Sequence, residues 1–177
     1  MSNSIQFNPV SSADGNWTIS KVQLPIGDNN RRSWGSKEEF PGSWSNTWIP
    51  NFTAHEYIVV HDQYGNIKHE FHGLAIDRKT NDEQVIGFFN DRLEYRKFED
   101  NHFNDSYGQD YNNNKAVIFS GSYEEVNEKV HLMMEAGRKI NAMDLDYPFF
   151  GLGVNSNSVA YTLIKAAGLE NYEFDNF

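Results

Sequence analysis

One stretch of this chain limits the possible folds more than any other: HEYIVVHDQYGNIKHEFHGLAID, residues 55 to 77. Two runs rich in β-branched and aromatic residues flank the sequence Asp-Gln-Tyr-Gly, which is typical of a β-hairpin closed by a type I turn. A four-residue loop of this kind pairs His61 with Asn66. Counting outward from that pair sets His55 opposite His72, with Cβ atoms about 5 Å apart on one face. The hairpin therefore predicts an antiparallel sheet that carries two neighbouring histidines.

The rest of the chain adds strands and then helices. Further strands are predicted at residues 16 to 25, 84 to 89, 92 to 97 and 115 to 120, with a polar loop at 99 to 114. The segment SYEEVNEKVHLMMEAGRKINAM has apolar residues at helical spacing, and Ser122 with Glu125 forms a capping box at its start. A second helix is expected to end at Gly168. This order favours an α+β fold, an antiparallel β-sheet packed against C-terminal helices.

The domain organisation is simple. A length of 177 residues fits a single domain over residues 1 to 177. Residues 1 to 50 hold all four tryptophans, which lie among Gly, Pro and Ser: Trp17, Trp34, Trp44 and Trp48. We interpret this part as an aromatic, turn-rich N-terminal arm on a core formed by residues 51 to 177. Its tryptophans are expected to be buried, or to form one wall of a cleft.

The composition excludes several classes of protein. A formal net charge of -10 disfavours a nucleic-acid partner, because phosphate binding depends on clustered Lys and Arg. The absence of cysteine removes disulfides, zinc-thiolate sites and a cysteine nucleophile. No stretch approaches the roughly 18 apolar residues of a membrane span, and the first residues do not resemble a signal peptide. We expect a soluble protein that is cytoplasmic or exported by a non-Sec route.

The start of the second predicted helix, in GVNSNSVAYTLIKAAGLE at residues 153 to 170, contains more serines than a cap requires. A serine in the first turn lies where unpaired backbone N–H groups and the helix dipole converge, which suits stabilisation of an oxyanion. Capping alone explains the same residues. Ser156 and Ser158 face about 200° apart on a helix, so one of them at most can look into a cleft.

The histidines supply a candidate base for such a serine. His55 and His72 share one face of the hairpin, whereas each of the others reads singly as a surface or hydrogen-bonded residue: His61, His69, His102 and His131. A metal site would combine His69 and His72 with Asp77 or Glu70. Residues three apart on a strand face opposite sides, so we expect neither a metal nor a cofactor.

The order of these residues is similar to that of the circularly permuted papain-like superfamily, which includes lecithin retinol acyltransferase. In that family a histidine opens a strand, a second histidine or polar residue follows, and a cysteine begins a helix in an Asn-Cys-x-x-Phe-Val type motif. Here His55, His72 and the run Asn155-Ser156-Asn157-Ser158-Val159 match these positions, which sets Ser156 in place of the cysteine. The same run looks like parts of bacterial polymorphic toxins and secreted effectors. A hydroxyl is a weaker nucleophile than a thiolate and requires a base.

The resemblance implies a permuted papain-like core and a hydrolase or acyltransferase that acts on an amide, ester or thioester. Ser156 would be the nucleophile, His55 its base and His72 the residue that orients His55, with Asn155 or Asn157 at the substrate or oxyanion. The substrate would be a peptide, peptidoglycan or lipid, and a toxin would have an immunity protein as partner. Two other hypotheses stay open: an inactive papain-like domain that binds a protein or small ligand, and an interaction domain in which these residues only cap the helix.

Overall fold

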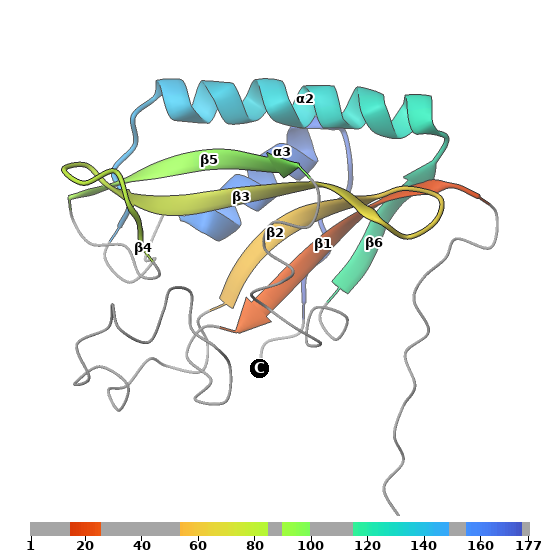
Figure 1. The fold of residues 1–177 in the computed structure, drawn as a ribbon, viewed down its shortest axis with the longest axis horizontal. Coiled ribbons are helices and arrows are strands. Elements are labelled where there is room, and N and C mark those ends of the chain that lie inside the picture. Colours follow the sequence, from red (N-terminus) through yellow and green to blue (C-terminus); the bar gives the residue numbers. More distant parts are fainter. Residues whose placement is uncertain (1–14, 26–53, 85–89, 100–114, 149–154, 175–177) are drawn as a thin grey trace, which may run out of the picture.

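The computed structural model of this chain describes residues 15–25, 54–84, 90–99, 115–148 and 155–174 (Figure 1). Its strands are β1 (Trp17–Pro25), β2 (Ala54–His61), β3 (Ile67–Asp77), β4 (Glu83–Gln84), β5 (Asp91–Glu99) and β6 (Lys115–Gly121). Its helices are α2 (Tyr123–Ala142) and α3 (Ser156–Ala166). Within these ranges no helix is long and apolar enough to cross a membrane. The predicted positions of the strands and of both helices are confirmed wherever they fall on described residues.

The six strands form one antiparallel sheet in the order β4-β3-β2-β1-β6, with β5 along the other edge of β3. Both helices pack against this sheet, which confirms the α+β fold (Figure 1). β1 lies between β2 and β6, so this part of the predicted N-terminal arm belongs to the central sheet. The other predictions for the arm concern Trp34, Trp44 and Trp48, which lie outside the described residues. Most of the predicted polar loop and residues 85–89 also lie outside them.

The predicted register of the hairpin is wrong by two residues. His61 pairs with Ile67 rather than Asn66, because Asp62 closes a longer loop by accepting hydrogen bonds from the backbone N–H groups of Tyr64 and Asn66, each at 2.9 Å. A β-bulge then shifts the ladder by one more residue, and Val60 pairs with His69. His55 and His72 are therefore not directly opposite. The two shifts of one residue add up to an even number, which keeps the predicted alternation of side chains. The side chains of His55 and His72 therefore still face the same side of the sheet.

The two sides of the sheet have different interiors. The side that faces α2 and α3, called the helix side below, holds the main apolar core: Ile19, Ile58, Val60, Phe71 and Leu93 against Val126, Val130, Met133, Val159, Leu163 and Ile164. The opposite side carries smaller buried apolar clusters: Val22, Tyr57 and Val59, and Leu74 with Ile76. Side chains along a strand alternate between these two sides, which assigns every strand residue to one of them.

β2 and β3 separate along part of their length, and we call this separation the split. The candidate site lies there. The pairing of β2 with β3 ends at Ile58 and Phe71, and farther along β3 the same edge pairs with β4 at Ala75 and Ile76. Figure 1 shows the first half of β2 turning away from β3. The start of α3 meets the sheet at this point, because a Cβ on Gly73 would lie 2.9 Å from Ser156 Cα.

Candidate functional site

His55 and His72 meet across the split in the sheet. His55 is the second residue of β2, and its Nε2 atom lies 3.0 Å from Nδ1 of His72. The two rings are nearly coplanar, with 9° between their planes, which is the geometry of a hydrogen bond between imidazoles. Tyr57 stacks on His72 with ring centroids 4.4 Å apart. The contact between the two histidines that the hairpin predicted is therefore present, although it is diagonal.

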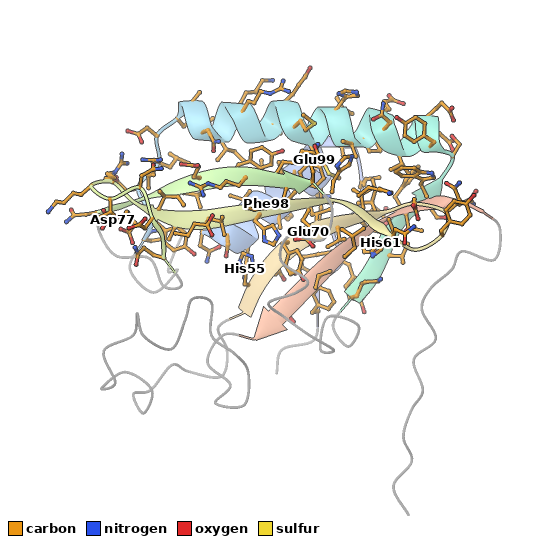
Figure 2. All side chains as sticks on the ribbon, in the orientation of Figure 1. His55, His61, Glu70, Asp77, Phe98 and Glu99 are labelled. Carbon is orange, nitrogen blue, oxygen red and sulfur yellow. The ribbon has the colours of Figure 1, made fainter. Side chains whose placement is uncertain are left out.

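Glu70 extends this pair to a line of three side chains. Its Oε2 atom lies 3.3 Å from Nε2 of His72, and Glu70, His72 and His55 are 1%, 0% and 7% exposed. Figure 2 labels Glu70 on β3 and His55 at the start of β2. Sequence reasoning considered Glu70 only as a metal ligand. The signal that could have identified it is its spacing, because a residue two positions before His72 on a strand shares its face.

Burial sets the protonation of His55. It lowers the pKa of the His55 imidazole well below the usual value, and the neighbouring His72 lowers that pKa further. The ring is therefore neutral near pH 7. A neutral imidazole can accept a proton, although a lowered pKa makes His55 a weaker base than an exposed histidine.

Asn155 and Ser158 cap α3, rather than Ser156. The Oδ1 atom of Asn155 accepts hydrogen bonds from the backbone N–H groups of Asn157 and Ser158, at 3.0 and 3.2 Å. Ser158 Oγ accepts the N–H of Asn155 in return at 3.3 Å, which completes a capping box. Ser156 is thus buried at the first helical position without contributing to the cap.

The polar groups of Ser156 lie close to two other side chains. Its hydroxyl donates to Asn157 Oδ1 at 3.3 Å, and the phenol of Tyr147 lies close enough for the polar groups of Ser156 to lower its pKa. Burial raises the pKa of the Tyr147 phenol, and the polar groups of Ser156 offset that rise only in part. Asn157 Oδ1 also accepts the backbone N–H of Glu56 at 2.9 Å. Ser156 is therefore two hydrogen bonds away from the residue that follows His55.

Ser156 and the histidines occupy different sides of the split. Gly73 faces the helix side, where an added Cβ would lie 2.7 Å from Val159 Cβ. Its neighbour His72 points the other way, and His55 lies with it. The structure thus brings Ser156, His55 and His72 to one end of the sheet, with the serine hydroxyl bonded to Asn157 and the imidazoles bonded to one another. Tyr147 was not identified from the sequence.

The chain next to His55 is fastened by a buried ion pair. Lys21 Nζ lies 2.9 Å from Glu56 Oε2 and donates to the backbone oxygen of Tyr172 at 2.8 Å. Burial raises the pKa of Glu56, and the hydrogen bond from Lys21 opposes the rise. Together with Asn157, this pair holds the first half of β2 where it has left β3.

The remaining predicted residues lie elsewhere. His69 Nδ1 lies 3.0 Å from Glu99 Oε2 on the helix side, so His69 and His72 face opposite sides as predicted. Asp77 accepts the backbone N–H groups of the turn that follows β3. His61 is buried 3.5 Å from Lys115 Nζ. Among the described residues, no group of three metal-ligating side chains could hold an ion. His102 lies outside the described residues.

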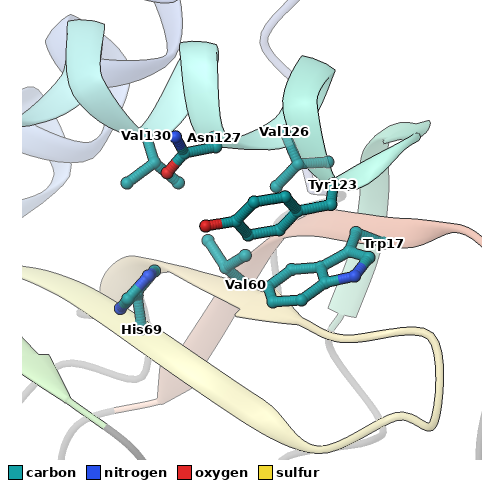
Figure 3. Close-up of a pocket in the computed structure, with 7 residues that line it drawn as sticks. All are labelled: Trp17, Val60, His69, Tyr123, Val126, Asn127 and Val130. Atoms are coloured by element: carbon teal, nitrogen blue, oxygen red, sulfur yellow. The ribbon is translucent and has the colours of Figure 1, made fainter.

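A small cavity lies on the helix side, away from the split (Figure 3). It measures about 30 Å³ and is lined by Trp17, Val60, His69, Tyr123, Val126, Asn127 and Val130. Trp17 donates to Gln63 Oε1 at 2.7 Å and packs edge-on against Tyr123. This volume fits about one water molecule, so Trp17 does not form the wall of a substrate cleft here.

No family model, curated protein or solved structure matches this chain.

Proposed function

We propose that this protein hydrolyses or transfers an acyl group held as an amide, ester or thioester. Ser156 is the nucleophile, His55 the general base and His72 the residue that orients His55. The observation that carries the proposal is the buried line of Glu70, His72 and His55 beside the start of α3. A buried imidazole pair and a buried helix-start serine are the side chains that acyl transfer needs, although the Ser156 hydroxyl is bonded to Asn157 rather than to His55.

The chemistry proceeds in two stages. Ser156 Oγ attacks the acyl carbon while His55 takes the hydroxyl proton, and the leaving group departs with that proton. Water or another acceptor then reverses the sequence and releases the acyl group. The backbone N–H of Ser156 stabilises the oxyanion, because the next two N–H groups of α3 donate to Asn155 Oδ1. Asn155 caps the helix and holds its first turn in position, and Asn157, whose Oδ1 accepts the Glu56 N–H, orients the substrate.

Tyr147 controls access to this chemistry. Its phenol lies close to Ser156, which opposes the rise of the Tyr147 pKa on burial, and we place it where the oxyanion would form. Attack therefore requires a substrate to displace Tyr147 and the serine hydroxyl to turn toward His55 at the split. The proposal accordingly gives Tyr147 a blocking role in the free protein.

The resemblance to permuted papain-like enzymes supports the same reaction class. It indicates peptides, peptidoglycan or lipids as substrates, and an effector or toxin with an immunity protein as the biological setting. The local motif that carries it is Asn155 to Val159, with serine at the position of the family's cysteine.

Labelling with a fluorophosphonate, followed by mass spectrometry, tests the proposal. We expect an adduct on Ser156 of the full-length protein, no adduct there in Ser156→Ala, and labelling at least about 100-fold slower in His55→Ala. Tyr147→Phe should label faster than the wild type, because the phenol no longer occupies the helix start.

Ser158→Ala is the matched control. It removes a hydroxyl two residues away that belongs to the cap, and it should retain labelling at Ser156. An absence of any Ser156 adduct in folded protein between about pH 6 and 9, in both wild type and Tyr147→Phe, would contradict an activated serine.

A second function, ligand binding without catalysis, is favoured by one observation: the Ser156 hydroxyl is bonded to Asn157, with Tyr147 beside it. A protein that only binds a ligand at this place would keep its serine in such contacts. In that case Ser156→Ala retains the biological effect of the protein, whereas the enzyme loses it in both Ser156→Ala and His55→Ala.

A further inference from the structure

We propose that Lys21 is a positioning residue for the candidate site. It links the segment that follows α3, residues 171–174, to Ser156. The link runs through Glu56 and Asn157, and each of its contacts joins two described residues. The link therefore does not depend on any reaction, whereas its effect on catalysis rests on the proposed function.

The segment that follows α3 supplies two contacts of the Lys21 ammonium group. Lys21 lies in the middle of β1 and is 1% exposed. Its Nζ atom lies 2.9 Å from Glu56 Oε2, donates to the backbone oxygen of Tyr172 at 2.8 Å and lies 5.6 Å from the centre of the Phe174 ring. Oxygen acceptors and a ring face both attract an ammonium group. If the segment lifts, water reaches Lys21 and weakens its bond to Glu56.

Lys21 also offsets a repulsion between this segment and β2. Burial raises the pKa of Glu56, Lys21 opposes that rise, and the nearby carboxylate of Glu173 adds to it. Glu56 and Glu173 therefore disfavour each other's charge. Because Lys21 contacts Glu56 and the backbone oxygen next to Glu173, it favours the contact of the segment with β2.

The backbone of Glu56 connects this ion pair to α3. Ile58 pairs with Phe71. Two residues farther along, a continued ladder would pair Glu56 with Gly73. Instead, the N–H of Glu56 donates to Asn157 Oδ1 at 2.9 Å. Asn157 thus takes the place that β3 would have on this edge of β2, and it joins the strand to the start of α3.

The same oxygen of Asn157 holds Ser156. The Ser156 hydroxyl donates to Asn157 Oδ1 at 3.3 Å, so this atom is shared by the serine and by Glu56. His55 precedes Glu56 on β2. A shift of Glu56 therefore moves both the candidate base and the amide that holds the candidate nucleophile. Lys21 acts on both through its bond to Glu56.

Amide hydrogen exchange in the full-length protein, followed by NMR, tests the link without any substrate. Lys21→Met keeps most of the side-chain length and removes the ammonium group. We expect the Glu56 N–H to exchange at least about tenfold faster relative to the Ile58 N–H, which lies on the same edge and stays paired with Phe71. A general loss of stability would accelerate both amides together. An unchanged ratio of the two rates would overturn the inference.

Two further variants test the two ends of the link. Phe174→Ala removes one contact of the segment with Lys21 and should change the ratio in the same direction by a smaller factor. An unchanged ratio there would overturn the role of the segment. Lys21→Met combined with Glu56→Gln leaves no unpaired buried charge, so it should fold even if Lys21→Met does not. Slow exchange of the N–H at position 56 in this double variant would overturn the inference.

Fluorophosphonate labelling tests the catalytic meaning of the link. Labelling of Ser156 should slow by about fivefold or more in Lys21→Met. Lys97→Met is the matched control, because it makes the same substitution at a lysine that pairs with Glu99 on β5. It should change neither the ratio of exchange rates nor the labelling.

The outcomes separate this inference from the proposed function. A changed exchange ratio in Lys21→Met, without any labelling of the wild type, would sustain the link and reject the proposed function. An unchanged ratio with labelling of the wild type would do the opposite. A changed ratio with an unaltered labelling rate would overturn the positioning role of Lys21.

Discussion

The two sides of the sheet use buried polar groups in different ways. On the helix side, amide side chains bond to backbone: Asn141 bonds to both the N–H and the oxygen of Tyr95, and Asn157 accepts the N–H of Glu56. On the opposite side, titratable side chains bond to one another in the line of Glu70, His72 and His55. The first pattern satisfies backbone groups at element ends, and the second joins ionisable side chains to one another.

The polar contacts on the two sides of the sheet should therefore respond differently to pH. The contacts of these two amides should depend little on pH, because amides do not titrate, whereas the Lys21–Glu56 and His69–Glu99 pairs on the same side contain titratable groups. The opposite side should respond to pH, because its imidazoles are neutral only while they stay buried. Ser156 belongs to the helix side, where its Cα would lie 2.9 Å from a Cβ added at Gly73 and its hydroxyl donates to Asn157 Oδ1.

The largest effect is expected from crowding the contact between α3 and the sheet. In Gly73→Ala the new Cβ would meet Val159 and the backbone of Ser156 at under 3 Å, so the helix must move. We expect a loss of about 3 kcal/mol in the free energy of unfolding, measured by urea denaturation.

Gly121→Ala is the control for that measurement. Its nearest neighbours are the Glu125 carboxylate at 2.8 Å and the Phe119 ring at 3.0 Å, both of them side chains rather than backbone, so the loss should be smaller and should include that of the capping-box bond of Glu125. Equal losses in the two variants would show that the close packing of α3 on β3 is not what Gly73 provides.

The next largest effect is a loss of stability in acid, which we expect from the buried histidines on the opposite side of the sheet. Burial lowers the pKa of His61 to about 3, and the pKa of His55 is also lowered, whereas both titrate near 6.5 when unfolded. Between these values the unfolded chain binds more protons, so stability is complete above about pH 6.5 and falls as the pH falls. His61 alone should remove about 2 kcal/mol between pH 6.5 and 5.

Unfolding free energies measured at several pH values in that window test this sign. His61→Gln should flatten the pH dependence. His131→Gln changes an exposed histidine on α2 and should leave the slope unaltered. A wild-type stability that rises on acidification would contradict the assignment of neutral buried imidazoles.

The smallest effect compares the two helix starts. Asn155→Ala and Ser122→Ala each remove an N-cap with a complete capping box, and each should cost about 1 kcal/mol. Only Asn155→Ala should also slow fluorophosphonate labelling, because only that cap lies beside Ser156. Slower labelling in both variants would point to general destabilisation.

Local sequence rules were enough to predict the positions of the strands and helices, and to predict which hairpin residues share one side of the sheet. Alternation placed His55 and His72 on the same side, and helical spacing placed α2 and α3. The register failed because Asp62 bonds to Asn66 and a bulge follows, and neither is encoded in turn statistics alone. The loop and the bulge each shift the register by one residue, and together they leave His55 and His72 on the predicted side of the sheet.

The arrangement of the site depended on contacts that sequence spacing does not report. The split between β2 and β3 arises from pairing with β4 and from the approach of α3 to Gly73. Tyr147 reaches Ser156 from outside both helices. Glu70 could have been recognised by its alternation with His72, since only its burial required the structure.

The bulge in the hairpin has a consequence for how this chain can change in length. The bulge gives β3 one extra residue between the His61–Ile67 and Val60–His69 pairs. Removal of Lys68 can therefore be absorbed by loss of the bulge, with Val60 still opposite His69 and with His72 and Gly73 on their present sides. The bulge thus allows this hairpin to lose one residue without moving the histidine pair.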